Sequence, residues 1–543
     1  MILILSRENR IRILILLIGI LLFIPFNGYV HLFDWDEINF AESAREMIVT
    51  GDYSTVKINF IPFWEKPPLF IWMQVLSMKI FGINEFAARF PNAVCGIITL
   101  LVLFELGSKL KDYKFGLFWA IAYGASVLPF LYFKSGIIDP WFNLFIFLSL
   151  YFGYKHLESC SSYPSRKIDL FLAGMTLGLA VLTKGPVAIL LFGTAFLFFI
   201  VLERRFHQIR WFDLLFFILT LIIVGGAYHI YQFTIGNRQL ITDFFEYQVR
   251  LLNTEDAGHG GSIIYHPVVL LIGVFPSSVL ALPALFKRTG RKDFNLLMVI
   301  LFWIVLVLFS LVKTKIVHYS SLCYFPISYL AATTLYRLST GREQLKKSTK
   351  LILMLIGLIY ALIPLVLKVV VSTELRPVLQ EYIHDDFALA CLGRFADWSN
   401  WELLPGLVLG LSLLISLFLK GLKKLFFVYA SITAYVFLFL LIILPKIESY
   451  SQGPAIDFIK ESKSNNVWIS TLEYKSYAPY FYSEKAHRAI DIGDENKFLL
   501  ESSSADSIYF IAKITSLERL LKTFPQLELV KKDGGYVLLK RIK

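Results

Sequence analysis

Long apolar runs constrain this chain more than any other feature of its sequence. Hydrophobic residues make up 56% of its 543 residues and charged residues only 17%, whereas soluble domains are about one quarter charged. Most runs approach the ~20 apolar residues that a helix needs to cross a bilayer. The sequence therefore predicts a polytopic α-helical membrane protein with about 13 transmembrane helices. They are expected near residues 13–30, 88–108, 115–133, 140–157, 168–184, 186–202, 211–231, 266–286, 294–312, 319–336, 350–371, 403–419 and 425–444.

The basic residues that give the net charge of +12 lie where they indicate the topology of the chain in the membrane. Every second connection between the runs is basic, as in "SRENRIR", "KLKDYK", "SRKID", "ERRFHQIR", "KRTGRKD", "YRLSTGREQLKKSTK" and "KGLKK". Short cytoplasmic loops carry an excess of Lys and Arg, so these segments and the N-terminus are predicted to lie inside. The positive charge is thereby explained without nucleic acid as a partner.

This orientation places three longer segments outside the membrane, residues 31–87, 232–265 and 372–402. The tail from about residue 446 also lies outside, and its composition differs. "GPAIDFIKESK" and "SLERLLKTF" are typical of short helices, while "NVWISTLEY", "DSIYFIAKI" and "GYVLLKRIK" are typical of strands. We therefore predict a transmembrane domain over 1–445 and a C-terminal soluble α/β domain over 446–543, a usual domain size.

The first outer segment, 31–87, opens with a cluster of acids in "LFDWDEINFAESARE". Asp34 as N-cap and Glu37 three residues later would form a capping box. The apolar residues that follow at helical spacing predict a helix lying along the membrane interface. Asp36 has no such structural role. We expect Asp34→Ala to cost stability and Asp36→Asn to cost activity.

Three further clusters carry charge on the same predicted side. Glu65 and Lys66 precede two prolines in "FWEKPPLFIW", either as a surface ion pair or as functional groups. Asp139 in "IIDPWF" is either a helix cap before proline or a functional carboxylate. Lys184 in "LTKGPVA" either extends outward from the membrane or binds a phosphate.

A fifth cluster combines the second outer segment, 232–265, with the chain after the ninth apolar run. Its histidine spacing is not a metal signature. The cluster consists of Glu246, Arg250, His259, His266, Lys313, Lys315, His318 and Tyr319.

Together the five clusters place carboxylates and several cations at one boundary between water and lipid. Carboxylates accept protons from hydroxyls or bind a metal, and cations hold a phosphate as it becomes a leaving group. This combination favours group transfer from a lipid-linked phosphate to an acceptor outside the membrane. One alternative is a transporter or flippase of a lipid-linked sugar, although such proteins tend to show repeats and charges at the membrane midplane. Another is a structural scaffold, which leaves the acids and cations unexplained.

Several blocks resemble the bacterial branch of the GT-C membrane glycosyltransferases. These blocks are "DWDEINFAESAREMIVTGDY", "FWEKPPLFIW", "IIDPWF", "GLAVLTKGPVAILL" and "FSLVKTKIVHYSSL". The branch includes the protein O-mannosyltransferases and the lipid A aminoarabinose transferases. The resemblance implies inverting transfer from a polyprenyl-phosphate sugar to a lipid A, glycan or protein acceptor. It also implies a site on the outer side of the bacterial cytoplasmic (inner) membrane.

The resemblance also implies roles for individual residues. Tyr247 stands where the aminoarabinose transferases commonly carry a histidine, three residues before the loop arginine. The resemblance requires no cofactor, and a divalent metal ion held by Glu65 and His259 is left as an open alternative. The predicted catalytic residues are Asp36, Glu37 and Asp139, and the predicted substrate-binding residues are Glu65, Lys66, Lys184, Arg250, Lys313, Lys315 and Tyr319.

Overall fold

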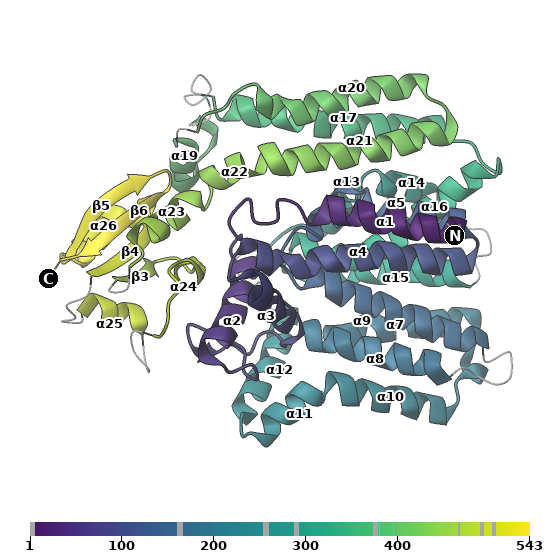
Figure 1. Ribbon diagram of the computed structural model, residues 1–543, viewed down its shortest axis with the longest axis horizontal. Coiled ribbons are helices and arrows are strands. Elements are labelled where there is room, and N and C mark those ends of the chain that lie inside the picture. Colours follow the sequence, from purple (N-terminus) through teal and green to yellow (C-terminus); the bar gives the residue numbers. More distant parts are fainter. Residues whose placement is uncertain are drawn as a thin grey trace, which may run out of the picture.

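A bundle of long helices forms most of the molecule (Figure 1). The computed structural model describes residues 6–159, 167–253, 260–286, 293–372, 378, 381–394, 396–464, 467–488, 494–501 and 507–542. The bundle contains α1 (Arg7–Phe23), α4 (Glu85–Leu110), α5 (Tyr113–Gly124), α6 (Val127–Tyr132), α7 (Asp139–Ser159), α8 (Lys167–Lys184), α9 (Val187–Glu203), α10 (Trp211–Gly225), α11 (Ala227–Thr234), α13 (Tyr265–Gly273), α14 (Ser277–Phe286), α15 (Phe294–Leu311), α16 (Tyr324–Ser339), α17 (Lys347–Val370), α20 (Leu404–Phe418) and α21 (Gly421–Ile442), with the 3-10 turns η1 (Phe206–Gln208), η2 (Val317–Cys323) and η3 (Trp401–Leu403).

Each predicted span overlaps a helix or consecutive shorter helices, although α1 ends at Phe23, well before the predicted end of the first span at residue 30. The breaks have local causes: α10 and α11 bend by 55° at Gly225–Gly226, and α13 and α14 bend by 120° around Pro276, as expected where glycine or proline interrupts helical hydrogen bonding. Among the described residues, five helices are long and apolar enough to cross a membrane, or seven if each bent pair is one span. The helical membrane architecture is therefore confirmed, while the count of about 13 stays a prediction.

The two ends of the bundle differ (Figure 1). The N-terminus and the turn between α20 and α21 lie at one end, where the sequence is basic. The opposite end carries the longer connections and the C-terminal sheet. The elements at this opposite end are α2 (Asp36–Thr50), β1 (Lys57–Ile58), β2 (Ile61–Pro62), α3 (Leu69–Phe81), α12 (Arg238–Asn253), α19 (Asp386–Leu392) and α22 (Leu444–Tyr450).

The chain after α22 folds around a four-stranded sheet in the order β3-β4-β6-β5. β3 and β4 are parallel, and the other two pairings are antiparallel. The three predicted strands and two predicted helices are present, but β5 was missed because its charged and largely exposed sequence, LELVKKD, suits only a sheet edge. The elements are α23 (Gly453–Ser462), β3 (Val467–Leu472), α24 (Ala478–Tyr482), α25 (Glu495–Glu501), β4 (Ser507–Lys513), η4 (Ile514–Ser516), α26 (Leu517–Thr523), β5 (Leu527–Asp533) and β6 (Tyr536–Arg541).

A shared apolar core joins α2 to this C-terminal region. Ile38 and Met47 of α2 pack in one cluster with Ile456 and Phe458 of α23. Every residue of α2 from Glu37 to Met47 is buried. The apolar face of α2 is therefore covered by protein, namely α3, the start of α4 and the C-terminal region, and not by lipid. The position of α2 along the membrane interface stays a prediction.

Candidate functional site

Asp36 is the first residue of α2, and its side chain is 37% exposed. The N-cap is Trp35 and makes no side-chain cap hydrogen bond, so the prediction that Asp34 caps the helix is wrong. Asp34 instead faces the C-terminal region, where its carboxylate accepts from the backbone N–H of Tyr477 at 3.5 Å. Burial there raises the pKa of the Asp34 carboxyl to about 6. A carboxylate at a helix N-terminus is favoured by the helix dipole, and here that carboxylate belongs to Asp36.

Glu37 is buried beside Arg89 of α4. Its carboxylate accepts from Arg89 Nε at 3.0 Å and Nη2 at 2.7 Å, and also from the N–H groups of Phe33 and Gly136. Burial alone would raise the pKa of Glu37, but the positive charge of Arg89 and these hydrogen bonds outweigh burial and lower it. The carboxylate of Glu37 is thus occupied by structural contacts, which differs from the catalytic role predicted for it.

Arg89 extends this contact to the segment that leads into α2. Its guanidinium donates to the backbone carbonyls of Asn27 and Val30 at 2.8 Å, and to that of His31 at 2.8 Å. The available sequence signal was an arginine at the outer edge of a predicted span, 88–108. The pairing itself was not visible, because Arg89 and Glu37 are 52 positions apart.

Asp139, Lys184 and His318 meet Asp36 at the same end of the bundle. Lys184 Nζ lies 2.7 Å from Asp139 Oδ1. His318 Nε2 lies 3.6 Å from Asp36 Oδ2 and 3.9 Å from Asp139 Oδ2. The imidazole therefore stands between the two predicted catalytic carboxylates. The sequence placed His318 in the outer cluster but gave it no role.

The two carboxylates differ in accessibility. The side chain of Asp139 is 3% exposed against 37% for Asp36. Asp139 begins α7, and its Oδ2 has no hydrogen-bond partner among the described residues. Asp36 is thus accessible, whereas Asp139 is buried against Lys184 and His318.

Cations and aromatic rings surround these carboxylates. Lys184 ends α8 and is followed by Gly185 with φ 106°, a backbone conformation that favours glycine. Its ammonium lies 5.4 Å from the Tyr319 ring centroid and 5.6 Å from that of Phe142, within cation–π range. The charge of Lys66 also acts on Asp139 and His318. The structure thus brings Lys66, Lys184 and Tyr319 to the predicted catalytic carboxylates.

The remaining predicted substrate residues are placed differently. Glu65 is half-buried and acts electrostatically on Tyr477, while Arg250 is exposed on α12 and Lys313 is exposed after α15. Lys315 is buried, and its ammonium donates to the carbonyls of residues 309, 310 and 312 at 2.5 to 3.1 Å. Lys315 therefore caps the C-terminus of α15, which differs from its predicted phosphate contact.

The C-terminal region contributes residues that the sequence did not indicate. Gln452 donates to the Leu32 carbonyl at 2.7 Å and accepts from the Asp34 N–H at 3.1 Å. The rings of Tyr477 and Trp35 are in edge contact, with centroids 6.1 Å apart. These contacts hold the chain immediately before Asp36.

The predicted metal alternative rests on residues that are only partly described. Glu65 is described, whereas His259 lies outside the described residues. Within the described ranges, no group of three or more His, Cys, Asp or Glu side chains could hold a metal ion. His266 is buried, and its Nδ1 lies 3.1 Å from the Ser320 hydroxyl.

Sequence comparison finds related proteins over about two thirds of the chain. Residues 65–228 match a family model described as dolichyl-phosphate-mannose-protein mannosyltransferase. An undecaprenyl phosphate-alpha-4-amino-4-deoxy-L-arabinose arabinosyl transferase of Photorhabdus laumondii is 26% identical over 65% of this chain and 64% of its own length. The enzyme of the same description from Pectobacterium carotovorum is 25% identical over 64% of this chain and 63% of its own length. The chain thus matches slightly less than two thirds of the length of these curated relatives.

Structure comparison extends the likeness to the whole chain. The crystal structure of ArnT from Cupriavidus metallidurans bound to undecaprenyl phosphate superposes with a TM-score of 0.76. The match covers 98% of both chains at 18% identity. The apo state of the same protein gives a TM-score of 0.75. The predicted resemblance is therefore confirmed: the chain has the GT-C membrane glycosyltransferase fold and is similar in sequence to the branch containing the protein mannosyltransferases and the aminoarabinose transferases.

Proposed function

We propose that this protein transfers a sugar, with inversion, from a polyprenyl-phosphate-linked donor to a lipid, glycan or protein acceptor. The observation that carries the proposal is the convergence of Asp36, Asp139, Lys184 and His318, which come from four elements far apart in the sequence. The accessible carboxylate of Asp36 suits an acceptor that must lose a proton. The nearby positive charge suits a donor that releases a phosphate.

Asp36 would act on the acceptor. A hydroxyl acceptor gives its proton to the Asp36 carboxylate as its oxygen attacks the anomeric carbon. The bond between that carbon and the phosphate oxygen breaks on the opposite face, and the bonding electrons leave with the polyprenyl phosphate. An acceptor that is already an ionised phosphate needs no base, and Asp36 then only orients it.

Lys66 and Arg250 would bind the donor phosphate. The Lys66 charge already acts within the carboxylate cluster, and the exposed Arg250 lies on α12 at the same end of the bundle (Figure 1). Charge-assisted hydrogen bonds to phosphate are about twice as strong as neutral ones. Lys184, held by Asp139, would keep His318 and the buried carboxylate in place, while Lys313 supplies a further exposed cation.

The relatives favour this class of donor. The two curated relatives carry undecaprenyl phosphate and an arabinosyl transfer in their names, and the ArnT crystal structure is described as bound to undecaprenyl phosphate. For this chain we propose a multi-pass protein of the bacterial cytoplasmic membrane with about 13 spans. The site and a C-terminal α/β domain over 446–543 would face the extracytoplasmic side.

The test expresses the wild type and two variants in a strain that lacks the protein and compares how far each restores sugar transfer. Mass spectrometry of lipid A, surface glycans and secreted proteins identifies the missing sugar. Wild type and Asp52→Asn should restore it, because Asp52 pairs with Lys57 at the far end of α2. Asp36→Asn should restore less than about 1% of it at an equal membrane level, since a general base contributes about 10²–10⁴-fold. Full restoration by Asp36→Asn would overturn the proposal and favour a transporter of lipid-linked sugar.

A further inference from the structure

The imidazole of His318 lies between the two carboxylates of the site. His318 belongs to η2, and its Nε2 is 3.6 Å from Asp36 Oδ2 and 3.9 Å from Asp139 Oδ2. One nitrogen therefore faces two carboxylates that come from different helices. The transfer reaction uses Asp36 as the base and leaves His318 without a part of its own.

The surroundings of His318 decide its charge. Its side chain is 16% exposed, and burial lowers its pKa from the ordinary value of about 6.5. The positive charges of Lys66 and Lys184 also lower this pKa, and the two carboxylates, which raise it, do not outweigh these effects. The imidazole is therefore neutral at pH 7, with a proton on one nitrogen. Because carboxylate oxygens face Nε2, that nitrogen is the favoured position of the proton.

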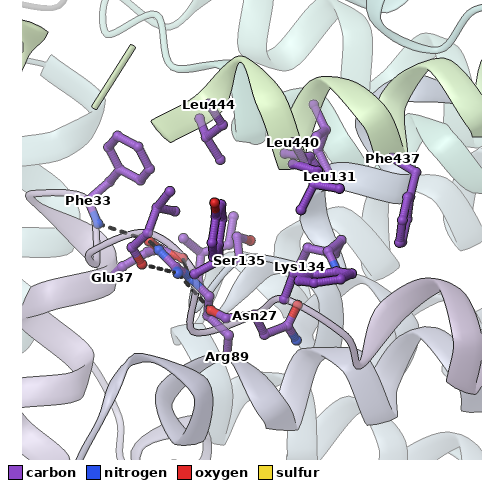
Figure 2. A pocket seen from close by; sticks show the side chains of 15 residues that line it. Asn27, Phe33, Glu37, Arg89, Leu131, Lys134, Ser135, Phe437, Leu440 and Leu444 are labelled. Atoms are coloured by element: carbon purple, nitrogen blue, oxygen red, sulfur yellow. Dashed lines mark hydrogen bonds and ion pairs between the residues drawn. The ribbon is translucent and has the colours of Figure 1, made fainter. Parts of the chain in front are cut away.

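Two carboxylates at one site bind a proton more readily than an isolated carboxylate does. A hydrogen bond to the charged form opposes this, because it stabilises the carboxylate. The adjacent acid, Glu37, receives such bonds from Arg89 beside a separate cavity (Figure 2). For Asp36, the Nε2–H group of His318 is placed to provide one.

The distances from His318 to the carboxylates are longer than the about 2.7–3.2 Å of a hydrogen bond. Hydrogen bonds of catalytic groups often shorten to this range when substrate binds. Asp139 is fixed on its other oxygen by Lys184, at 2.7 Å. The more exposed Asp36 is thus the carboxylate that can move toward His318.

We propose that His318 is a positioning residue for sugar transfer, an inference that rests on the proposed function. Its Nε2–H holds the Asp36 carboxylate toward the acceptor and stops Asp36 and Asp139 from sharing a proton. Asp36 then stays charged and takes the proton of an acceptor hydroxyl, which passes to solvent after the transfer. His318 itself neither gains nor loses a proton.

The experiment measures how transfer depends on pH. Detergent-solubilised membranes of the deletion strain supply the native donor and acceptor, and purified full-length protein is added. Mass spectrometry follows the transferred sugar per folded molecule between about pH 4 and pH 9. Other groups that interact electrostatically with Asp36, Asp139 or His318 are unchanged in variants of His318, so a difference between these variants reports the imidazole. These groups are Lys66, Lys184, Tyr132, Tyr324 and Tyr477.

His318→Leu has no donor to place between the carboxylates. Its maximal rate should fall about tenfold, since the base is no longer held in position. As pH falls, it should lose transfer about one pH unit earlier than the wild type, because its carboxylates hold a proton more tightly. His318→Gln carries an amide N–H in place of the imidazole N–H. It should keep the wild-type pH dependence and recover most of the rate.

His266→Leu is the matched control. His266 is also buried at this end of the bundle, but its Nδ1 lies 3.1 Å from the Ser320 hydroxyl and not beside a carboxylate. This variant should lose thermal stability without a change in the pH at which transfer is half-maximal. Where His318→Leu does not fold, His318→Asn replaces it, because its shorter side chain holds the amide away from the carboxylates.

The outcomes separate this role from the proposed function. A wild-type pH dependence in His318→Leu, with Asp36→Asn inactive, would overturn the role of His318 alone. A loss in His318→Gln as large as that in Asp36→Asn would also overturn it, since His318 would then be the base itself. Full transfer by Asp36→Asn would overturn the proposed function and this inference with it.

Discussion

Asp36 and Glu37 are neighbours in the chain, yet their removal should have opposite consequences. In Glu37→Gln one oxygen becomes an amide nitrogen, so two of the four donors now at the carboxylate lose their acceptor. Arg89, which is 3% exposed, then carries a buried charge without its counter-ion. Breaking a buried pair in this way costs about 3–5 kcal/mol.

Asp36→Asn removes a much weaker structural contact. The carboxylate of Asp36 is 37% exposed, and its ion-pair distance to His318 is 3.6 Å. Partly exposed pairs contribute about 0–1 kcal/mol, so the free energy of unfolding should change little. If Asp36 is the base, transfer should fall about 10²–10⁴-fold, which corresponds to about 3–5 kcal/mol of barrier.

Both quantities are measurable on purified protein in one detergent. Denaturant unfolding in mixed micelles gives the free energy of unfolding, and transfer from the lipid-linked donor gives kcat per folded molecule. The free energy of unfolding of Glu37→Gln should be at least about 3 kcal/mol lower than that of the wild type. The folded fraction of this variant should retain a part of the activity. The reasoning is refuted if Asp36→Asn keeps full transfer, or if both variants lose equal stability and activity follows the folded fraction.

Three further outcomes follow from the contacts. Lys184→Met should lower kcat at least tenfold because the buried Asp139 loses its counter-ion, and Lys184→Arg should recover part of it. Burial next to Glu42 raises the pKa of Glu46 from 4.5 to about 8. The folded protein therefore loses stability as pH rises through this range. In measurements of unfolding against pH, Glu46→Gln should reduce this loss and have little effect near pH 4. Lys315→Met should lower the unfolding midpoint by uncapping α15 while leaving donor affinity unchanged in a binding titration.

Sequence periodicity and charge were sufficient for the parts of the fold that depend on local pattern. The apolar runs located the helices, and the basic connections gather at one end of the bundle (Figure 1). The breaks at Gly225–Gly226 and Pro276 also had a local signal. The convergence of Asp36, Asp139 and Lys184 followed from a topology that puts three loops on one side.

The failures share a physical cause, which is contact between distant segments. The capping box at Asp34 satisfied every local rule, yet the helix begins at Asp36 because the residues before it bond to groups more than 400 positions away. Lys315 resembled an available cation, but backbone carbonyls at the end of α15 take its donors. Nor did the sequence show that the Glu37 carboxylate pairs with Arg89 of α4; its catalytic role stays a prediction.

The same long-range contacts explain how Asp36 is held in position. The segment before α2 is fixed on one side by Arg89, which binds the carbonyls of Asn27, Val30 and His31. Gln452 fixes its other side by bonding to both Leu32 and Asp34. Each contact uses backbone groups, so it constrains the path of the chain whatever side chains the segment carries. A catalytic carboxylate must be placed within about 0.5 Å to work, and a short loop between two helices cannot supply such rigidity alone. The bundle and the C-terminal region therefore act together as the support of one side chain.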